Sequence, residues 1–205
     1  MTTKARELAD LLETLRSCQR CSLCETRTNI VLGAGSPDAQ IMFVGEAPGY
    51  HEDLQGEPFV GAAGKLLDEL LRDTLGIRRE DVYIANVLKC RPPENRDPTS
   101  SEVDTCRPFL LRQVDIIHPR IICTLGNFAT KTLTDRRDGI TKLRRKVIRA
   151  GGRQVFPMFH PAAALHRGNL YEEVRLDFTA LKELLESPEL AQEAKGAETS
   201  QMELF

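Results

Sequence analysis

Four of the six cysteines in this sequence form two groups whose spacing suggests metal binding. One group is a Cys-x-x-Cys pair near the start of the chain, and the other pair follows much later. These residues are Cys18, Cys21, Cys90 and Cys106. Thiolates are ligands of zinc and of iron–sulfur clusters. In a chain without a secretion signal, such an arrangement is more typical of a metal site than of disulfides.

The composition is that of a globular protein with one well-buried domain. The chain has 205 residues, of which 41% are apolar, and this is enough to form a single core. The segment from Met1 to Arg16 is charged and lacks the apolar block of a signal peptide, and no other segment approaches a membrane span. We therefore expect a cytoplasmic protein without membrane contact, whose thiols are reduced.

The formal net charge of −2 hides a strong segregation of charge along the chain. Residues 120–153 contain ten Lys and Arg against two Asp, whereas residues 183–205 contain six Glu against one Lys. The net charge argues against a uniformly basic nucleic-acid binder, and a basic run is usually a solvated surface. If the protein acts on nucleic acid, however, the basic segment is a natural phosphate contact.

Four short apolar segments are typical of strands that are buried on both faces. They span residues 40–45, 81–87, 120–126 and 154–159. Helical periodicity follows Gly64, Asn127 and a capping box from Thr99 to Glu102, and two further helices are expected at 8–15 and 171–185. This alternation predicts an α/β protein, a three-layer α/β/α sandwich with a central four-stranded parallel sheet.

Polar motifs follow three of these predicted strands. They are Gly45-Glu46-Ala47-Pro48-Gly49 with Glu52-Asp53 and Gly56-Glu57-Pro58-Phe59-Val60-Gly61, then Asn86 with Lys89-Cys90-Arg91-Pro92-Pro93, and finally His160-Pro161. Ligand sites in sheets of this kind form outside the carboxyl ends of the strands. We therefore expect the three loops to meet at one edge of the sheet.

Together these motifs resemble the iron–sulfur uracil-DNA glycosylases of thermophilic bacteria and archaea, the family 4 enzymes. The resemblance runs from about Cys18 to Leu185, which is nearly the whole chain. It implies a monofunctional hydrolase of N-glycosyl bonds. Such an enzyme extrudes deoxyuridine from DNA, releases uracil and leaves an abasic site for base excision repair.

The motifs contain the residue types that this reaction needs. Phe59 would stack on the extruded uracil. Asn86 offers an acceptor for uracil N3–H and a donor for O4, a pattern that cytosine does not match. His160 would donate to uracil O2, where negative charge develops as the bond breaks. Gly45 and Gly49 complete the expected substrate site.

Two carboxylates are candidates for positioning the attacking water or stabilising the cationic sugar. Glu46, inside the first motif, ranks ahead of Asp53. In the better-known uracil-DNA glycosylases the corresponding loop is Gly-Gln-Asp-Pro-Tyr, in which Asp positions water and Tyr excludes thymine. Ala47 and Gly49 stand at those places here, so neither role carries over. The missing Tyr leaves open a broader specificity for deaminated bases.

The family resemblance assigns the four cysteines named above to one structural [4Fe–4S] cluster. The local spacing alone favours a different set, because Cys18-x-x-Cys21-x-x-Cys24 resembles a bacterial ferredoxin run. A structural zinc fits the same four cysteines as the cluster. We adopt the cluster, because it gives the later pair a purpose. Cys24 is then a spare thiol, and Cys123 is a core residue.

DNA contacts are expected from the basic segment and from the loops around the site. Arg91 and Arg96 follow the second predicted strand, and Leu165 and Arg167 follow the His160 motif. Leu165, His166 or Arg167 could fill the gap that the extruded nucleotide leaves in the duplex.

We expect a single domain over residues 1–186, a flexible acidic tail over 187–205, and a monomer. The tail has little to bury. Its end, with Gln201, Leu204 and Phe205, resembles the short peptide by which bacterial repair enzymes bind the replicative sliding clamp.

Two rival functions use the same metal. One is a non-catalytic iron–sulfur module that binds DNA, and the other is an electron carrier. A carrier has no need of Phe59, Asn86 and His160, and a pure DNA binder has no need of a carboxylate in the facing loop.

Overall fold

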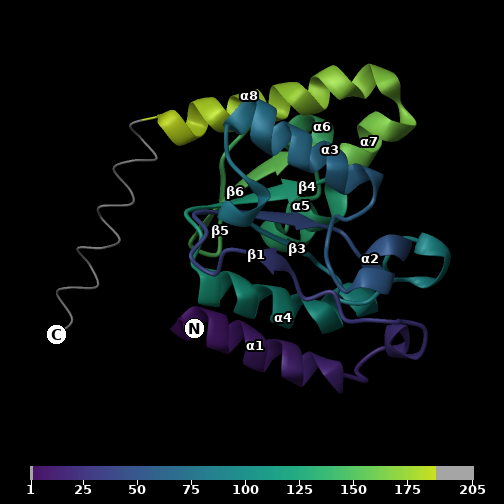
Figure 1. Ribbon diagram of the computed structural model, residues 1–205. Coiled ribbons are helices and arrows are strands. Elements are labelled where there is room, and N and C mark those ends of the chain that lie inside the picture. Colours follow the sequence, from purple (N-terminus) through teal and green to yellow (C-terminus); the bar gives the residue numbers. More distant parts are fainter. Residues whose placement is uncertain (1, 188–205) are drawn as a thin grey trace, which may run out of the picture.

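The computed structural model of the protein describes residues 2–187 and has three layers (Figure 1). A single sheet lies between two groups of helices. Helices α1 (Thr3–Arg16) and α4 (Ser100–Ile117) cover one face, and α3 (Ala62–Leu70) and α8 (Tyr171–Glu186) cover the other. The predicted α/β class with three layers is confirmed.

Four parallel strands form the middle of the sheet. They are β3 (Tyr83–Asn86), β2 (Ile41–Gly45), β4 (Ile121–Leu125) and β6 (Arg153–Met158), in that spatial order. The register pairs Gly45 with Asn86, so β2 and β3 end side by side. The helices that follow β2 and β3, α3 and α4, lie on opposite faces of the sheet. This reversal is the arrangement around which ligand sites form in such sheets.

The four predicted parallel strands are confirmed, but the sheet of the described residues has six strands, because a short antiparallel strand that was not predicted is added at each edge. β1 (Ala34–Gly35) pairs with β3, and β5 (Ile148–Ala150) pairs with β6. Strands of two and three residues are too short to show the alternating pattern by which strands are recognised in a sequence.

The central strands are apolar because both of their faces are covered. All five residues of β2 are buried. Met42 and Val44 belong to the core beneath α1 and α4, whereas Ile41 and Phe43 belong to the core beneath α3 and α8. Side chains alternate between the faces of a strand, so each β2 residue packs on one of two cores. This leaves the strand ends as the place for polar groups.

The remaining helices are short, apart from α5, and connect these layers. They are α2 (Tyr50–Gln55), α5 (Asn127–Thr134), α6 (Ile140–Leu143) and α7 (Pro161–His166). Single helical turns are found at η1 (Ser22–Glu25), η2 (Leu71–Leu75), η3 (Arg79–Asp81), η4 (Pro93–Asn95) and η5 (Gly168–Leu170). The predicted capping box is confirmed. Thr99 Oγ1 accepts the Glu102 N–H, and the Glu102 carboxylate accepts the Thr99 N–H at 2.8 Å.

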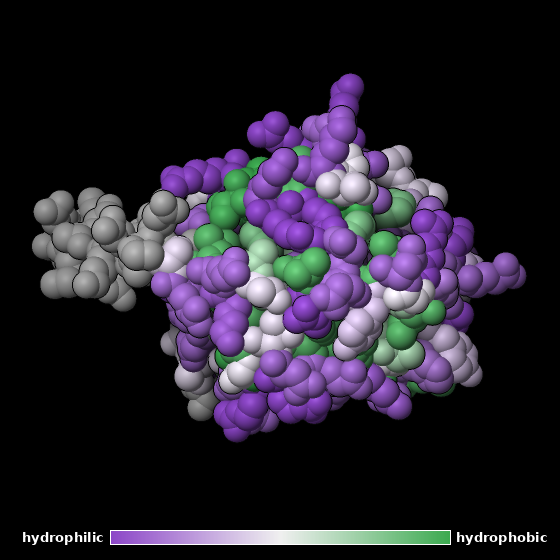
Figure 2. All heavy atoms as spheres, turned by 90° about the horizontal axis from the view of Figure 1, so that it is seen from above, coloured by the Kyte–Doolittle hydropathy of each residue, from purple (hydrophilic) through white to green (hydrophobic). Residues whose placement is uncertain are grey.

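Figure 2 views the molecule from the side of α3 and α8. Hydrophilic atoms on this face are interleaved with small hydrophobic areas. This is the surface expected of helices whose apolar sides are turned to the sheet.

Across residues 2–187, no helix combines the length and the apolar content that crossing a membrane requires. The predicted acidic tail lies almost entirely within residues 188–205. Those residues, with Gln201, Leu204 and Phe205, lie outside the described part of the chain.

Candidate active site

The loops after three parallel strands meet at the edge of the sheet where the carboxyl ends of those strands lie, as predicted. Gly45 ends β2 beside Asn86. A Cβ atom added to Gly45 would stand 2.4 Å from Asn86 Oδ1 and 2.8 Å from Phe59 Cζ. Because no side chain fits in that space, glycine at position 45 allows Asn86 and Phe59 to approach each other.

Phe59 belongs to the loop between α2 and α3, and its ring packs on the imidazole of His160. The ring centroids are 5.4 Å apart and the planes are inclined by 23°. Phe59 is 5% exposed, and Asn86 is 2% exposed. The loops after β2, β3 and β6 thus bring an aromatic ring, a carboxamide and an imidazole to one place.

His160 is held in one tautomer by its position at the start of α7. Its Nδ1 atom accepts the backbone N–H of Ala162 at 3.1 Å. Nδ1 therefore carries a lone pair, and in the neutral ring the proton is on Nε2. Desolvation lowers the pKa of His160 to about 4, against a smaller opposing effect of Glu52. At neutral pH the residue is an uncharged hydrogen-bond donor.

Glu46 is a partly buried carboxyl group that follows β2 directly. Burial, with a further contribution from the negative charge of Asp97, raises its pKa to about 7. The loop after β2 is fixed to the loop after β3, since the Glu46 carbonyl accepts the Leu88 N–H at 3.0 Å. A carboxyl group in this state can exchange a proton near neutral pH.

Asp53, predicted as a second catalytic carboxylate, has a structural role instead. It is 2% exposed. Both of its carboxylate oxygens accept the N–H of Thr28, at 2.9 and 3.1 Å, and one also accepts the N–H of Asn29. With its lone pairs directed at the backbone, Asp53 anchors the segment that follows η1 and is not free to position a water molecule.

The neighbouring Glu52 faces the site loop, which sequence reasoning missed. Its Oε1 atom accepts the N–H groups of Val60 and Gly61, both at 2.9 Å. A Cβ added to Gly49 would stand 2.8 Å from Glu52 Oε2. Gly49 thus leaves room for this carboxylate. The motif contains both acids in sequence, but the spacing alone does not indicate which of them turns toward the loop.

A small cavity brings together all four predicted metal ligands. The side chains around it are Leu15, Cys18, Arg20, Cys21, Cys24, Arg27, Lys89, Cys90, Thr105, Cys106 and Phe109. All six cysteines have free thiols. Arg27 Nη1 lies 3.4 Å from Cys90 Sγ as a donor, and the Lys89 backbone N–H donates to the Cys106 sulfur. The later pair of cysteines and the N-terminal pair thus line the same cavity.

The donor set of four thiols around one cavity fits an iron–sulfur cluster, and it fits a four-cysteine zinc site as well. Within residues 2–187, no group of three or more Cys, His, Asp or Glu side chains is placed to hold one metal ion. N–H donors to sulfur stabilise thiolate ligands in metal sites of either kind.

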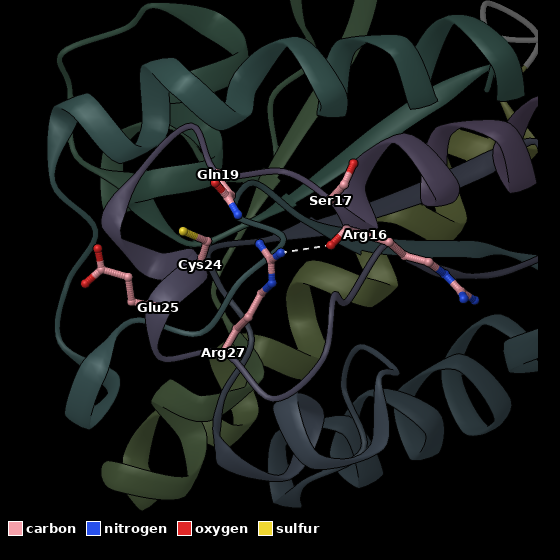
Figure 3. Close-up of a pocket in the computed structure, with 6 residues that line it drawn as sticks. All are labelled: Arg16, Ser17, Gln19, Cys24, Glu25 and Arg27. Carbon is pink, nitrogen blue, oxygen red and sulfur yellow. Dashed lines mark hydrogen bonds between the residues drawn. The ribbon is translucent and has the colours of Figure 1, made fainter.

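A surface pocket of about 440 Å³ adjoins the cysteine cavity (Figure 3). Its lining residues are Arg16, Ser17, Gln19, Cys24, Glu25 and Arg27. Figure 3 shows the Arg27 guanidinium reaching the carbonyl oxygen of Arg16, with an Nη2 to O distance of 3.1 Å. Cys24 and Arg27 line both spaces. None of the residues that line this pocket is Phe59, Asn86 or His160. The pocket is therefore separate from the site at the strand ends.

Lys89 links the cysteine cavity to the Asn86 site. It is fully buried, and its Nζ atom donates to the Asn86 carbonyl oxygen at 2.6 Å. Desolvation lowers the pKa of Lys89 to about 8, against the opposing influence of Cys106 and Cys90. The residue that precedes one predicted metal ligand therefore supports the backbone of the predicted base reader.

Several predicted DNA contacts are instead engaged within the protein. Arg96 forms two hydrogen bonds with the carboxylate of Glu102, at 2.9 and 2.7 Å, and this pairing lowers the pKa of Glu102 to about 2. In the basic segment, Arg144 and Arg145 both donate to Asp177, which is fully buried. The prediction that these two arginines contact phosphate is therefore corrected, because their charges are neutralised by α8.

Other predicted contacts remain accessible. Leu165 is 50% exposed and lies on α7, the helix that begins at His160. Arg167 is exposed just after the same helix. Arg91 is partly exposed, and its guanidinium lies 5.1 Å from the ring of Tyr50, which is 52% exposed. These exposed groups belong to the segments that follow β2, β3 and β6, which also carry the site residues.

Comparisons with known proteins agree on one family. A family model described as "Uracil DNA glycosylase superfamily" matches residues 32–183. The chain is 49% identical over 185 residues to a type-4 uracil-DNA glycosylase of Archaeoglobus fulgidus, covering 86% of this chain and 92% of that protein. Enzymes of the same description from Sulfurisphaera tokodaii and Thermotoga maritima are 48% and 47% identical. They cover 88% and 86% of this chain, and 86% and 93% of their own lengths.

Proposed function

Because the chain belongs to the uracil DNA glycosylase superfamily and is closely similar to its type-4 members, we propose that it excises uracil from DNA by the residues gathered at the strand ends. The reaction is hydrolysis of an N-glycosyl bond, which begins base excision repair. The observation that supports this site best is the approach of Phe59 and Asn86 at Gly45, together with the packing of the Phe59 ring on His160.

In this proposal the extruded uracil lies against Phe59 with its polar edge at Asn86. Stacking on the aromatic ring contributes about 1–3 kcal/mol to binding. The Asn86 carboxamide accepts from N3–H and donates to O4. Cytosine presents the opposite pattern there, so its binding would leave buried polar groups unpaired, which is costly. Base selection thus follows from one side chain.

His160 stabilises the leaving base. As the glycosidic bond breaks, negative charge develops on uracil O2. The neutral Nε2–H group of His160 can donate a hydrogen bond to this oxygen and so stabilise the charge. The donor is pre-oriented by the Ala162 hydrogen bond. It therefore needs little rearrangement during the reaction.

Glu46 acts on the other fragment, the electron-poor sugar. Its ionised carboxylate either positions the attacking water or stabilises the positive charge that develops at the sugar. Asp53 takes no part in this step, because its oxygens are bound to backbone N–H groups.

Replacing Glu46 with glutamine is expected to lower uracil release about 100-fold at about pH 8. The wild-type carboxyl group has a pKa of about 7, so it loses its proton as the pH rises through that value. The wild-type kcat/KM should rise over the same range and then level off, whereas the glutamine variant should show no such step. Rates measured from about pH 5 to about pH 9 test this, and a wild-type profile without a step contradicts it.

The same variant tests the pKa of Glu46 without reference to catalysis. A raised pKa means that the ionised carboxylate destabilises the folded protein. This penalty is absent at low pH, where the group is protonated in both states, and is complete above about pH 7. Glu46→Gln should therefore raise Tm at about pH 8 and leave it unchanged at about pH 4. Equal effects at both values would show that the group is not perturbed.

We propose that Cys18, Cys21, Cys90 and Cys106 hold a [4Fe–4S] cluster. When bound, the cluster supplies a rigid cross-link rather than electrons, since hydrolysis needs no electron transfer. The cross-link would join the segment after α1 to the loop after β3. Its support is the shared cavity with its N–H donors to sulfur.

Replacing Cys106 with alanine is expected to remove the bound iron and to lower Tm by about 10 °C. Cys123→Ala is the matched control, because Cys123 is also a buried cysteine but packs in the core beneath α3 and α8. That control should keep its iron and visible absorption. Iron analysis and thermal unfolding decide the matter. Full iron content in the Cys106 variant would overturn the ligand assignment.

In this proposal DNA is held by accessible groups on the segments that carry the site. Leu165 enters the gap left by the extruded nucleotide, and Arg91 and Arg167 contact phosphate groups. The single domain over residues 1–186, the monomeric state, the cytoplasmic location and the clamp-binding tail stay predictions.

A further inference from the structure

Phe59 is held in a backbone conformation that large side chains rarely adopt. Its φ is 53°, in the left-handed region. The site turn, defined as residues 58–61, must therefore be stabilised by contacts from elsewhere. The residues that hold this turn therefore determine the position of the Phe59 ring.

Arg79 holds the carbonyl side of the site turn. Its Nη1 atom donates to the Phe59 carbonyl at 3.1 Å, and its Nη2 atom donates to the Pro58 carbonyl. The guanidinium is itself fixed by Asp68 of α3, whose Oδ1 atom lies 2.9 Å from Nη1. Arg79 opens η3, on the far side of α3 in sequence, so this contact is not local.

The N–H groups of the turn and its packing against α3 are fixed as well. Its Val60 and Gly61 N–H groups donate to Glu52. A Cβ added to Gly64 would stand 1.8 Å from the Phe59 carbonyl oxygen, so the first turn of α3 lies directly against it. Two side chains, Glu52 and Arg79, therefore hold the turn, and Arg79 is the one that bonds to the carbonyl oxygen of Phe59 itself.

We propose that Arg79 is a positioning residue, which fixes Phe59 in the left-handed conformation and thereby aligns its ring with His160 and the uracil site. The inference rests on the proposed role of Phe59 as the stacking surface. A planar guanidinium has paired donors that can reach two neighbouring carbonyl oxygens at once. A lysine ammonium has one nitrogen atom and cannot reproduce this pair of hydrogen bonds. Without this pair, Phe59 relaxes toward an ordinary backbone conformation and its ring leaves His160.

A double-mutant cycle measures whether Arg79 acts through Phe59. Single-turnover release of uracil should be about 10- to 100-fold slower in Arg79→Gln, the effect expected of a misplaced substrate contact. Arg78→Gln is the matched control, because Arg78 is the adjacent arginine but pairs with Glu80 and Asp81 at the surface. That variant should stay within about twofold of the wild type. In the Phe59→Ala background, Arg79→Gln should cost almost nothing more.

The outcomes separate the two hypotheses. If Phe59→Ala releases uracil at the wild-type rate, the proposed stacking role is wrong. If Phe59→Ala is slow and Arg79→Gln is not, only the role of Arg79 is overturned. An equal loss from Arg79→Gln in both backgrounds also overturns it, because Arg79 would then act by another route.

A spectroscopic measurement tests the position of the ring in the absence of substrate. The chain has four histidines, so the imidazole signals in a proton NMR spectrum are few, and the His160→Gln variant identifies those of His160. Stacking on Phe59 shifts these signals by the ring current. Arg79→Gln and Arg79→Lys should move them toward their positions in Phe59→Ala, whereas Arg78→Gln should not. Unmoved signals in folded samples of both Arg79 variants overturn the inference.

Discussion

Replacing His160 with alanine is expected to slow the release of uracil about 100- to 1,000-fold, the usual cost of removing one donor to a developing oxyanion. The effect is large because the Nε2–H group is aligned before the reaction by the Ala162 hydrogen bond. The measurement is single-turnover cleavage of an oligonucleotide with one deoxyuridine, followed by alkaline scission of the abasic product. Substrate affinity should change much less than the rate, since the donor acts mainly on the transition state.

His118→Asn is the control for this experiment. His118 caps the carboxyl end of α4 with a φ of 52° and precedes β4, so it lies at the opposite edge of the sheet from the site. Asparagine tolerates that backbone conformation. The control should release uracil at the wild-type rate. A His160→Ala enzyme that keeps a rate within about threefold of the wild type would falsify the assigned role.

Replacing Asn86 with alanine is expected to lower kcat/KM for uracil release by a similar factor, about 100- to 1,000-fold. The loss arises because the uracil N3–H and O4 groups would be buried without partners at the end of β3. The substitution leaves the Asn86 carbonyl in place, so its hydrogen bond from Lys89 should persist. The visible absorption of the proposed cluster should therefore be unchanged, which separates base reading from metal binding.

Asn86→Asp is the isosteric partner of this experiment. It keeps the acceptor and replaces the donor with a second acceptor, so uracil O4 loses its hydrogen bond while the amino group of cytosine gains one. The ratio of uracil release to cytosine release should fall accordingly. If Asn86→Ala and Asn86→Asp both keep the wild-type rate and selectivity, then another group reads the base.

The general position of the site was predictable because its physical cause is local. Strands buried on both faces have continuous apolar runs, so Ile41–Gly45 and the other central strands could be recognised and their carboxyl ends located. Polar residues just beyond those ends, such as Asn86 and His160, had to lie near one another. The cysteine assignment came instead from the family resemblance, since spacing alone favoured a run through Cys24.

The unpredicted features depend on contacts between residues that are distant in sequence. No local pattern indicates that Arg79 bonds to the carbonyl of Phe59, or that Glu52 rather than Asp53 faces the loop. The same holds for Arg144, whose charge is indistinguishable in sequence from that of the lysines nearby. Tertiary packing decides which partner a polar side chain meets, and the periodicity of apolar residues does not indicate that partner.

The pairing of Arg144 and Arg145 with α8 has a consequence for the ion atmosphere around bound DNA. A cation that contacts phosphate displaces about 0.9 of a condensed counterion, and the salt dependence of affinity counts such displacements. Arginines already neutralised by Asp177 and Glu173 displace none. The salt sensitivity of DNA binding should therefore be shallower than the ten basic residues of this segment suggest. A larger share of the affinity then comes from the extruded base, which salt affects little.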